Sequence, residues 1–401
     1  MSLTKRPNPY RSWSYLEAGH DYRAFDLAPE IGRVAPFVVT LDVAGEERVR
    51  RLLGEHVYIS LHEHTMVFPR RMADAQDYTR SGRITTGFEG LSRGHWDAIF
   101  DGLLDGILNF HSKHGWKWSE VIEDLGLRLC DLAHQDVVFH ARTVDDILRA
   151  HREDRVAWIG HLEGAAMIEN EVDRIDVLYG LGIRCLGIAY SESNALGSGL
   201  KEPRDGGLTS FGKQAVRRMN QVGMLIDCSH AGSQTTLDTV AASQQPIALT
   251  HIGARALWES NRLAPDEVLK AVAGKGGVIG VEAAPHTTIS AKHPRHDLDA
   301  VMEHFEYIKD LVGIDHVTFG PDTLYGDHVA LHDAYTANLS IGETRRATPP
   351  FPKVEYVEGL ENPTEGSINL VRVLVNYGYG DEDIAKVMGG NVLRLLRAVW
   401  A

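Results

Sequence analysis

Residue types that bind divalent metals stand at the ends of short apolar runs in this chain. The runs are HVYISLHEH, VAWIGHLEG, MLIDCSH, PIALTH and HVTFGPD, and their metal-type residues are His62, His64, Glu163, His230, His251 and Asp322. In a parallel α/β barrel the carboxyl ends of the strands form the active site, so residues far apart in the chain converge there. Imidazole and carboxylate groups are common ligands of zinc. The pattern predicts a metallohydrolase.

The first of these runs carries two histidines separated by one residue, His62 and His64. Side chains of a strand alternate between its two faces, so both imidazoles should lie on one face, where they could chelate a single ion. Glu63 lies between them and should point to the opposite face. We therefore expect a structural role for Glu63.

Apolar runs alternate with helical patterns over most of the chain. Strands are expected near Val57–Leu61, Trp96–Phe100, Val156–His161, Cys185–Tyr190, Met224–Cys228, Ile247–Thr250, Val278–Val281 and Val317–Phe319. Amphipathic helices are expected at 143–153, 210–223, 264–277 and 298–313, and a short one at the C-terminus. Regular alternation of strands and helices predicts a parallel sheet with helices outside, and eight strands predict a (β/α)8 TIM barrel of the metal-dependent hydrolase type.

The 401 residues are expected to form a single domain, because barrels of this type often exceed 250 residues. We divide it into an N-terminal extension, residues 1–55, and a barrel, residues 56–401. Two connections are longer than the usual two to six residues of α/β units, and they follow the first and the eighth strand. They run from Thr65 to His95 and from Asp327 to Asn362. Both are candidate lids or pocket walls.

Composition narrows the class of partner. The formal net charge of −14 argues against nucleic acid or an anionic membrane surface as a partner and favours a small-molecule substrate. Three cysteines without CxxC spacing indicate neither a disulfide framework nor a cysteine zinc site. The N-terminus has no apolar signal segment, and no run is long enough to span a membrane. We expect a soluble, cytoplasmic protein, and the sequence leaves a homo-oligomer open.

Longer stretches of the chain resemble the membrane (renal-type) dipeptidases, peptidase family M19 of the amidohydrolase superfamily. The most specific stretches are GGLTSFGKQAVRRMNQVGMLIDCSH, LTHIGARAL, YVEGLENP and VMGGNVLRLL, and the less specific ones are IGHLEG, SNRLAPDEVL and GIDHVTFGPD. The resemblance runs from the first predicted strand to the C-terminus.

The resemblance implies a binuclear site, usually of zinc, in which a hydroxide between the metals attacks the scissile carbonyl. By position, His62 and His64 would hold one ion, His230 and His251 the other, and Glu163 would bridge them. Two adjacent cations lower the pKa of a bound water towards neutrality, which agrees with this division.

The resemblance also assigns residues to proton transfer and to substrate binding. Asp322 corresponds to the aspartate that takes the proton of the water and passes it to the leaving amine. Arg262 corresponds to the arginine that binds the free carboxylate of the substrate, and a planar fork of donors suits that task. Arg255 is the alternative for this second role and could instead be a helix-surface residue.

The chain departs from the family pattern at two positions. The first motif of the family is H-x-D, whereas this chain has His64 as the third residue, which makes the centre more positive. Where the family has a histidine at the end of the fourth strand to polarise the carbonyl, this chain has Tyr190. A phenol can donate a hydrogen bond to a developing oxyanion, but it cannot do so as a cation, and its size reshapes the pocket.

These observations leave several functions open. The first is a binuclear zinc hydrolase that cleaves an amide bond next to a free carboxylate, in dipeptides or N-acyl amino acids. The second is a specialised amidohydrolase that acts on a different small-molecule amide, which Tyr190 and the two long loops favour. A metal-dependent decarboxylase and a non-catalytic metal-binding scaffold are the remaining alternatives, and the dipeptidase-like stretches argue against both.

Overall fold

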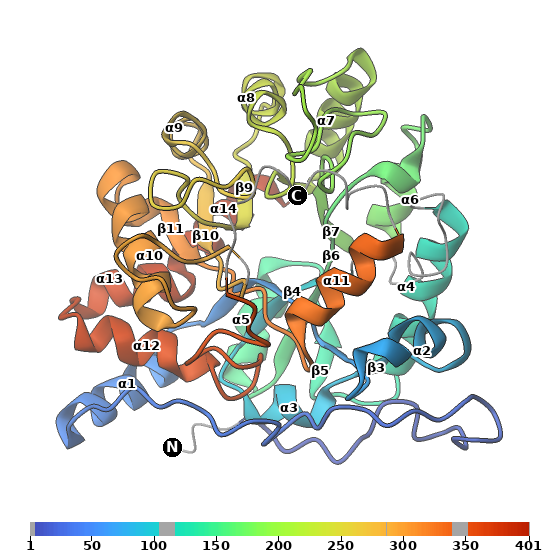
Figure 1. Ribbon diagram of the computed structural model, residues 1–401, viewed down its shortest axis with the longest axis vertical. Coiled ribbons are helices and arrows are strands. Elements are labelled where there is room, and N and C mark those ends of the chain that lie inside the picture. The colour runs from blue at the N-terminus through green and yellow to red at the C-terminus, as the bar shows by residue number, and fades with distance from the viewer. Residues whose placement is uncertain (1–4, 104–116, 286, 339–351, 401) are drawn as a thin grey trace.

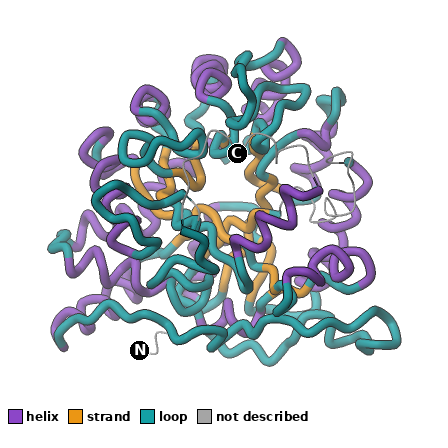
Figure 2. Tube along the Cα trace, in the orientation of Figure 1, coloured by secondary structure: helices purple, strands orange, loops and turns teal. Residues whose placement is uncertain are grey.

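The computed structural model describes residues 5–103, 117–285, 287–338 and 352–400, and the side chains of 335–338 are not considered. Within these residues a ring of parallel strands is surrounded by helices (Figures 1 and 2). In order around the ring the strands are β1 (Ile59–Glu63), β4 (Ala98–Gly102), β6 (Val156–Leu162), β7 (Ile183–Gly187), β8 (Leu225–Asp227), β9 (Ala248–Ile252), β10 (Val278–Val281) and β11 (Val317–Phe319). The predicted barrel and its eight strands are therefore confirmed.

The ring closes between its first and last strands at the carboxyl edge. The Asp322 N–H donates to the His62 carbonyl at 3.1 Å, and the His64 N–H donates to the Thr323 carbonyl at 2.9 Å. Glu63 strengthens this seam, because its Oε2 accepts hydrogen bonds from both the backbone N–H and the hydroxyl of Thr323, at 2.8 and 2.7 Å. Its side chain thus binds the neighbouring strand end.

One strand of the sheet was not expected from the sequence. β5 (Val138–His140) pairs with the amino-terminal half of β6, and β7 pairs with the carboxyl-terminal half. β5 has only three residues, which is too short for a period-two pattern to be recognised. Strand bounds also differ, since the expected strand Cys185–Tyr190 ends at Gly187 and leaves Tyr190 in the following loop.

The helices outside the ring include the expected ones. They are α4 (Trp118–Leu132), α5 (Val144–Arg152), α6 (Arg174–Gly180), α7 (Ser210–Val222), α8 (Ser233–Ala242), α9 (Asp266–Gly274), α10 (Leu298–Val312), α12 (Ser367–Asn376), α13 (Asp381–Ala385) and α14 (Asn391–Val399). α7 illustrates how the sequence sets their bounds. The Thr209 side chain caps its start by accepting from the Gly212 N–H, and Gly223 ends it with a left-handed φ of +79°. Between these residues Ala215, Val216 and Met219 form the buried face.

The long connection after β1 has its own secondary structure. It contains the antiparallel pair β2 (Met66–Val67) and β3 (Thr85–Thr86) and the short helices α2 (Ala75–Ser81) and α3 (Phe88–Arg93). The connection after β11 contains α11 (His328–Asn338), which packs against α2, while residues 339–351 lie outside the described part. The two long connections therefore meet on the carboxyl side of the ring, where α11 crosses the view in Figure 1.

The N-terminal segment runs along one side of the barrel before it enters α1 (Val43–Glu55), the blue helix of Figure 1. The helix begins at Asp42, whose side chain accepts from the Gly45 N–H, and it buries Val49 and Leu52. None of the helices in the described residues is both long enough and apolar enough to cross a membrane.

Candidate metal centre

Six of the residues identified in the sequence come together at the carboxyl ends of five strands. His62 and His251 belong to β1 and β9, His64 and Glu163 directly follow β1 and β6, and His230 and Asp322 each lie three residues beyond β8 and β11. All six side chains are buried, with exposures of 6% or less. The structure therefore brings these six residues together, as the sequence predicts.

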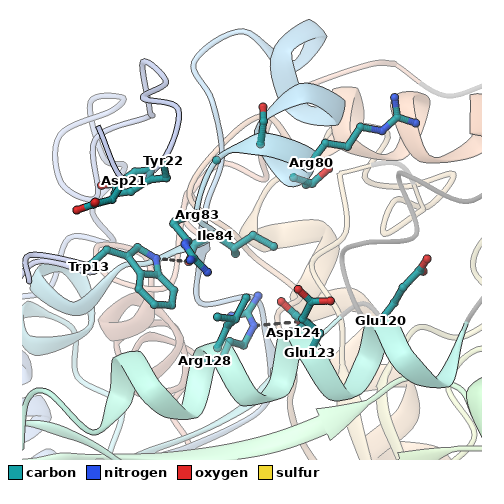
Figure 3. A pocket seen from close by; sticks show the side chains of 14 residues that line it. Trp13, Asp21, Tyr22, Arg80, Arg83, Ile84, Glu120, Glu123, Asp124 and Arg128 are labelled. Carbon is teal, nitrogen blue, oxygen red and sulfur yellow. Dashed lines mark hydrogen bonds and ion pairs between the residues drawn. The ribbon is translucent and has the colours of Figure 1, made fainter. Parts of the chain in front are cut away.

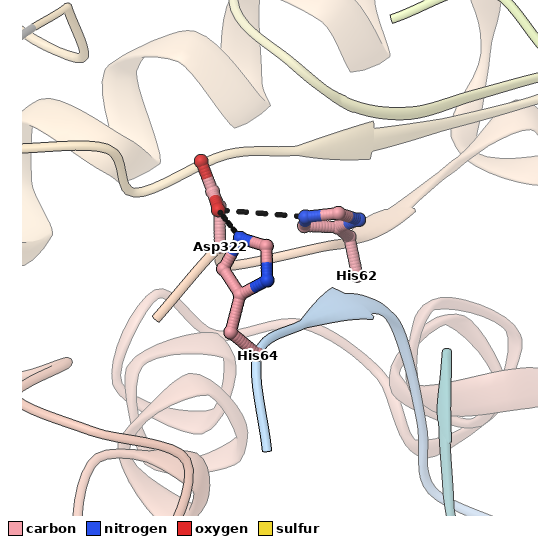
Figure 4. Close-up of side chains that lie close together, drawn as sticks. All are labelled: His62, His64 and Asp322. Carbon is pink, nitrogen blue, oxygen red and sulfur yellow. Dashed lines mark ion pairs between the residues drawn. The ribbon is translucent and has the colours of Figure 1, made fainter. Parts of the chain in front are cut away.

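The donor atoms lie close enough to share metal ions. One donor atom from each of His62, His64 and Asp322 lies within 4.8 Å of the other two, and the same holds for His62, Glu163 and His251. Asp322 Oδ1 is 3.1 Å from His64 Nε2 and 3.4 Å from His62 Nε2, as Figure 4 shows. His230 joins the second group, because its Nε2 is 3.3 Å from Glu163 Oε2 and 2.9 Å from His251 Nε2.

Each imidazole has Nδ1 directed away from the centre and Nε2 directed into it. His64 Nδ1 donates to the Gly102 carbonyl at 2.6 Å. His251 Nδ1 is 2.8 Å from the Thr250 hydroxyl, and His230 Nδ1 is 3.3 Å from the Ser191 hydroxyl. Ligating histidines in metalloproteins typically use the outer nitrogen in this way, which fixes the tautomer and leaves the other nitrogen free for the metal.

Among the described residues, buried polar atoms of the centre that make no hydrogen bond include Glu163 Oε1 and His62 Nε2, and the nearest charged group to the latter is Asp322 at 3.4 Å. Buried polar atoms are nearly always satisfied in native proteins, so such atoms indicate a missing partner. The space they surround is kept open by Gly102, because a Cβ there would lie 2.5 Å from His62 Cε1 and 2.8 Å from Glu163 Oε1. A nitrogen- and oxygen-rich donor set of this kind fits zinc or a similar divalent cation.

The buried charges of the centre shift the pKa values of its groups in different directions. Burial alone would raise the pKa of Glu163, but the adjacent histidines, first His62, lower it to about 2, so the carboxylate is ionised. Burial and the nearby Arg262 lower the pKa of His230 to about 4, so this imidazole is neutral. Burial also tends to lower the pKa of His64, but Asp322 and Glu163 raise it to about 9. A cation therefore has to displace a proton from His64.

Asp227 orients the second group of ligands, His251 in particular, through hydrogen bonds to neighbouring hydroxyl groups. It accepts hydrogen bonds from the Ser229 hydroxyl at 2.7 Å and from the Thr250 hydroxyl at 2.8 Å. Since the Thr250 hydroxyl donates to Asp227, its oxygen is free to accept from His251 Nδ1. This chain of hydrogen bonds holds the His251 ring in one orientation.

The structure adds two histidines that the sequence analysis did not single out. His161 on β6 is buried, with Nδ1 3.3 Å from His62 Nδ1 and Nε2 3.2 Å from Asp227 Oδ2. It precedes Glu163 by two residues, so strand periodicity could have placed it on the same face. His328 begins α11, and its Nε2 is 3.9 Å from Asp322 Oδ1. No strand pattern indicates His328, because it reaches the site from a helix in the long connection.

Comparison with known proteins identifies the family of this chain. The model of the family "Membrane dipeptidase (Peptidase family M19)" matches residues 46–338, which is most of the chain. The chain belongs to peptidase family M19. It is similar to the dipeptidase tcpJ of Claviceps purpurea, with 28% identity over 279 residues, which are 69% of this chain and 58% of that protein. The M19 chain thus matches little more than half the length of this relative.

Solved structures share the fold of this M19 chain. An amidohydrolase from Pseudomonas aeruginosa is 24% identical and has a TM-score of 0.72, with 88% of this chain and 99% of that one covered. A metallo peptidase from Rhodobacter sphaeroides, solved with a phosphinate mimic of the dipeptide L-Ala-D-Ala, is 20% identical with a TM-score of 0.64, and 86% and 100% of the two chains are covered. Both confirm the barrel architecture.

Tyr190, the main departure from the M19 pattern, lies beside the second group of ligands. Its ring stacks on His230 with a centroid distance of 4.2 Å, and its side chain is nearly buried, at 6% exposure. Met66 and Phe68 from the first long connection, Leu331 from the second, and Leu324 just before it pack in the same apolar cluster. Tyr190 therefore lies at the centre, where both long connections meet. Its role in catalysis stays a prediction.

The two arginines proposed for substrate binding have different surroundings. Arg255 donates from Nε to the Ser260 and Leu263 carbonyls at 3.1 and 2.9 Å, so it braces the loop that carries Arg262. Arg262 is 7% exposed, and its Nη2 lies 2.6 Å from Glu282 Oε2. Glu282 is a site residue that the sequence analysis missed, although its place directly after β10 is a strand-end position like those of the ligands.

A buried charge network supports the M19 centre from the side of α4. Asp101 accepts from the Thr65 N–H at 2.9 Å and from Trp158 Nε1 at 2.7 Å, and Arg128 Nη1 is 3.6 Å from its Oδ2. Thr65 directly follows His64, so this network fixes the end of the first motif.

Figure 3 shows Arg128 beside Asp124 at a separate cavity of about 480 Å³, which contains none of the six candidate ligands.

Proposed function

We propose that this M19 chain is a hydrolase that depends on divalent metal ions, most suitably two zinc ions, and cleaves an amide bond in a small molecule. The observation that carries the proposal is the cluster of four imidazoles and two carboxylates, with buried donor atoms that lack a partner. His62 and His64 would hold one ion, with the Asp322 carboxylate beside them. His230 and His251 would hold the other, and Glu163 would be shared by both.

Divalent cations at these residues would polarise the scissile carbonyl and lower the pKa of a water towards neutrality. The protein groups would do the rest. Asp322 Oδ1 lies 3.4 and 3.1 Å from Nε2 of His62 and His64, so this carboxylate would be near enough to accept the proton of the attacking water and to pass it to the leaving nitrogen. The Tyr190 hydroxyl is the candidate donor to the carbonyl oxygen, since its ring stacks on His230 at the edge of the centre.

The backbone at Asp322 supports this role. Its φ is +61°, a left-handed conformation that residues other than glycine seldom adopt. Strained backbone of this kind concentrates at functional sites, where the surrounding structure holds a side chain in a required direction. The two hydrogen bonds across the β1–β11 seam hold it here.

Two substrate classes are compatible with this reaction. Dipeptides and N-acyl amino acids carry a free carboxylate next to the amide, and the name of the Claviceps relative and the dipeptide mimic bound by the Rhodobacter enzyme favour them. Amides without that carboxylate are the second class, and the contact between Arg262 and Glu282 favours them.

The metal content tests the first half of the proposal. We expect elemental analysis of the metal-replete protein to find close to two divalent ions per chain, because five ligand residues are too many for one open catalytic zinc. Glu163→Gln should lower the content, since it removes the carboxylate shared by both ions. A chain saturated by one ion would contradict the binuclear assignment.

A substrate screen tests the second half. Zinc-loaded protein should be incubated with L,L- and L,D-dipeptides, N-acyl amino acids and simple amides, with Glu163→Gln as the inactive control. Hydrolysis of any of these amides at an enzymatic rate, for which about 10 per second is typical, would support the proposal. Inertness towards every amide would reject it.

A further inference from the structure

The guanidinium of Arg262 donates hydrogen bonds to groups of the protein itself. Its Nη1 donates to the Ser229 carbonyl at 2.9 Å, and its Nη2 donates to the His251 carbonyl at 3.0 Å. Ser229 precedes the candidate ligand His230, and His251 is itself a candidate ligand. The guanidinium therefore lies directly behind the second metal group.

The charge of Arg262 is matched by Glu282. This residue follows β10, which stands between β9 and β11 in the ring, so it lies between the strand ends that carry His251 and Asp322. Its side chain is fully buried, and its Oε2 is 2.6 Å from Arg262 Nη2. The Thr287 hydroxyl donates to its other oxygen, Oε1, at 2.8 Å. The carboxylate is thus held in place from two sides.

From this arrangement we infer that Glu282 occupies the position on Arg262 that a substrate carboxylate would need. The substrates are then amides whose group next to the scissile bond is uncharged, such as an amide or an ester. This inference rests on the proposed function and names its substrate class.

The physical reason is the balance of charge in a buried place. Burial raises the pKa of Glu282 to about 7, so above this pH a substrate carboxylate next to it would bring two anions to one guanidinium, and like charges in a desolvated site repel strongly. Displacing Glu282 instead would leave a buried carboxylate without its cation, which is also unfavourable. An uncharged group avoids both penalties.

Matched substrates test the inference in the wild-type protein. We expect zinc-loaded protein to release benzoate from N-benzoylglycinamide with a kcat/KM at least about tenfold higher than from N-benzoylglycine, because only the second carries the carboxylate. A higher kcat/KM for N-benzoylglycine would overturn the inference while leaving the proposed amide hydrolysis intact.

Binding of a carboxylate that cannot be hydrolysed gives a readout independent of turnover. The Kd of 3-phenylpropanoate, measured by calorimetry on the zinc-loaded protein, should fall by about tenfold or more in Glu282→Gln, which keeps the shape of the side chain and removes its charge. The same variant should hydrolyse N-benzoylglycine faster than wild type does.

Glu259→Gln is the matched control, because it makes the same change of charge at an exposed position three residues before Arg262. It should leave both the Kd and the kcat/KM unchanged. If Glu282→Gln binds 3-phenylpropanoate no better than wild type, the Glu282–Arg262 pair is only structural and the inference is wrong. If that variant fails to fold, the comparison of the two benzoyl substrates in the wild type decides.

Discussion

Replacing Gly102 by alanine should remove the metal centre and leave the barrel in place. Gly102 ends β4, and a Cβ at this position would lie 2.5 Å from His62 Cε1, 2.9 Å from His64 Cε1 and 2.8 Å from Glu163 Oε1. Ordinary contact begins near 3.4 Å, so His62 would have to move by about 0.9 Å, Glu163 by about 0.6 Å and His64 by about 0.5 Å. Metal–ligand distances tolerate only about ±0.2 Å.

We expect Gly102→Ala to lose metal affinity by about 100-fold or more, which is the upper end of what displaced supporting groups cause elsewhere. The assay is metal content by elemental analysis after dialysis against a graded series of chelator concentrations, with circular dichroism to confirm the fold. Gly126→Ala is the control, because Gly126 lies in the exposed part of α4 with no atom within 4 Å of its added Cβ. It should bind metal normally and gain up to about 1 kcal/mol of stability. Full metal content in Gly102→Ala would refute the geometry of the centre.

Three further perturbations test other parts of the site and fold. Asp322→Asn should keep its metals and lose roughly 10²–10⁴-fold in kcat, because it removes the proton acceptor while asparagine tolerates the left-handed backbone; activity within about threefold of wild type would place the proton transfer elsewhere. Tyr190→Phe should lower kcat by roughly 10²-fold if the hydroxyl donates to the oxyanion. A nearly unchanged kcat in this variant, together with dipeptidase activity gained by Tyr190→His, would make Tyr190 a wall of the pocket. We favour this second role. Burial lowers the pKa of His304 to about 4 from 6.5. Between these pH values the unfolded chain binds a proton that the native protein does not. The free energy of unfolding should therefore be lower by about 2 kcal/mol at pH 5 than above pH 6.5. Denaturant unfolding should show a flatter pH dependence between pH 7 and 5 in His304→Asn, and equal slopes would contradict the assignment.

The sequence was sufficient for the barrel and for the convergence of the six candidate residues because both depend on local patterns. A strand that is buried on both faces appears as a short apolar run, and a functional side chain at its carboxyl end, such as Glu163 after VAWIGHL, stands out as a polar residue directly after that run. His64 also directly follows its strand, whereas His62 and His251 lie within theirs and His230 and Asp322 lie three residues beyond theirs. The topology of a parallel barrel then supplies their convergence without any further information from the sequence.

Other parts of the site could not be predicted because they depend on contacts between distant segments. His328 reaches Asp322 from a helix, so no strand-end pattern precedes it. Glu282 does follow an apolar strand, but nothing in the local sequence indicates that its partner is Arg262. For the same reason, family resemblance could assign Arg262 to a substrate carboxylate without indicating which carboxylate it meets in this chain.

The seam between β1 and β11 links the assembly of the candidate metal centre to the folding of the chain. Glu63 and Thr323, which join across it, are 260 residues apart, and His64 and Asp322 lie immediately beside them. Contacts of such sequence separation form late, because the loop that they close is almost the whole domain. The proposed proton acceptor Asp322 therefore reaches His62 and His64 only when the last strand has docked against the first. Under the proposed function, turnover would then report that the ring has closed.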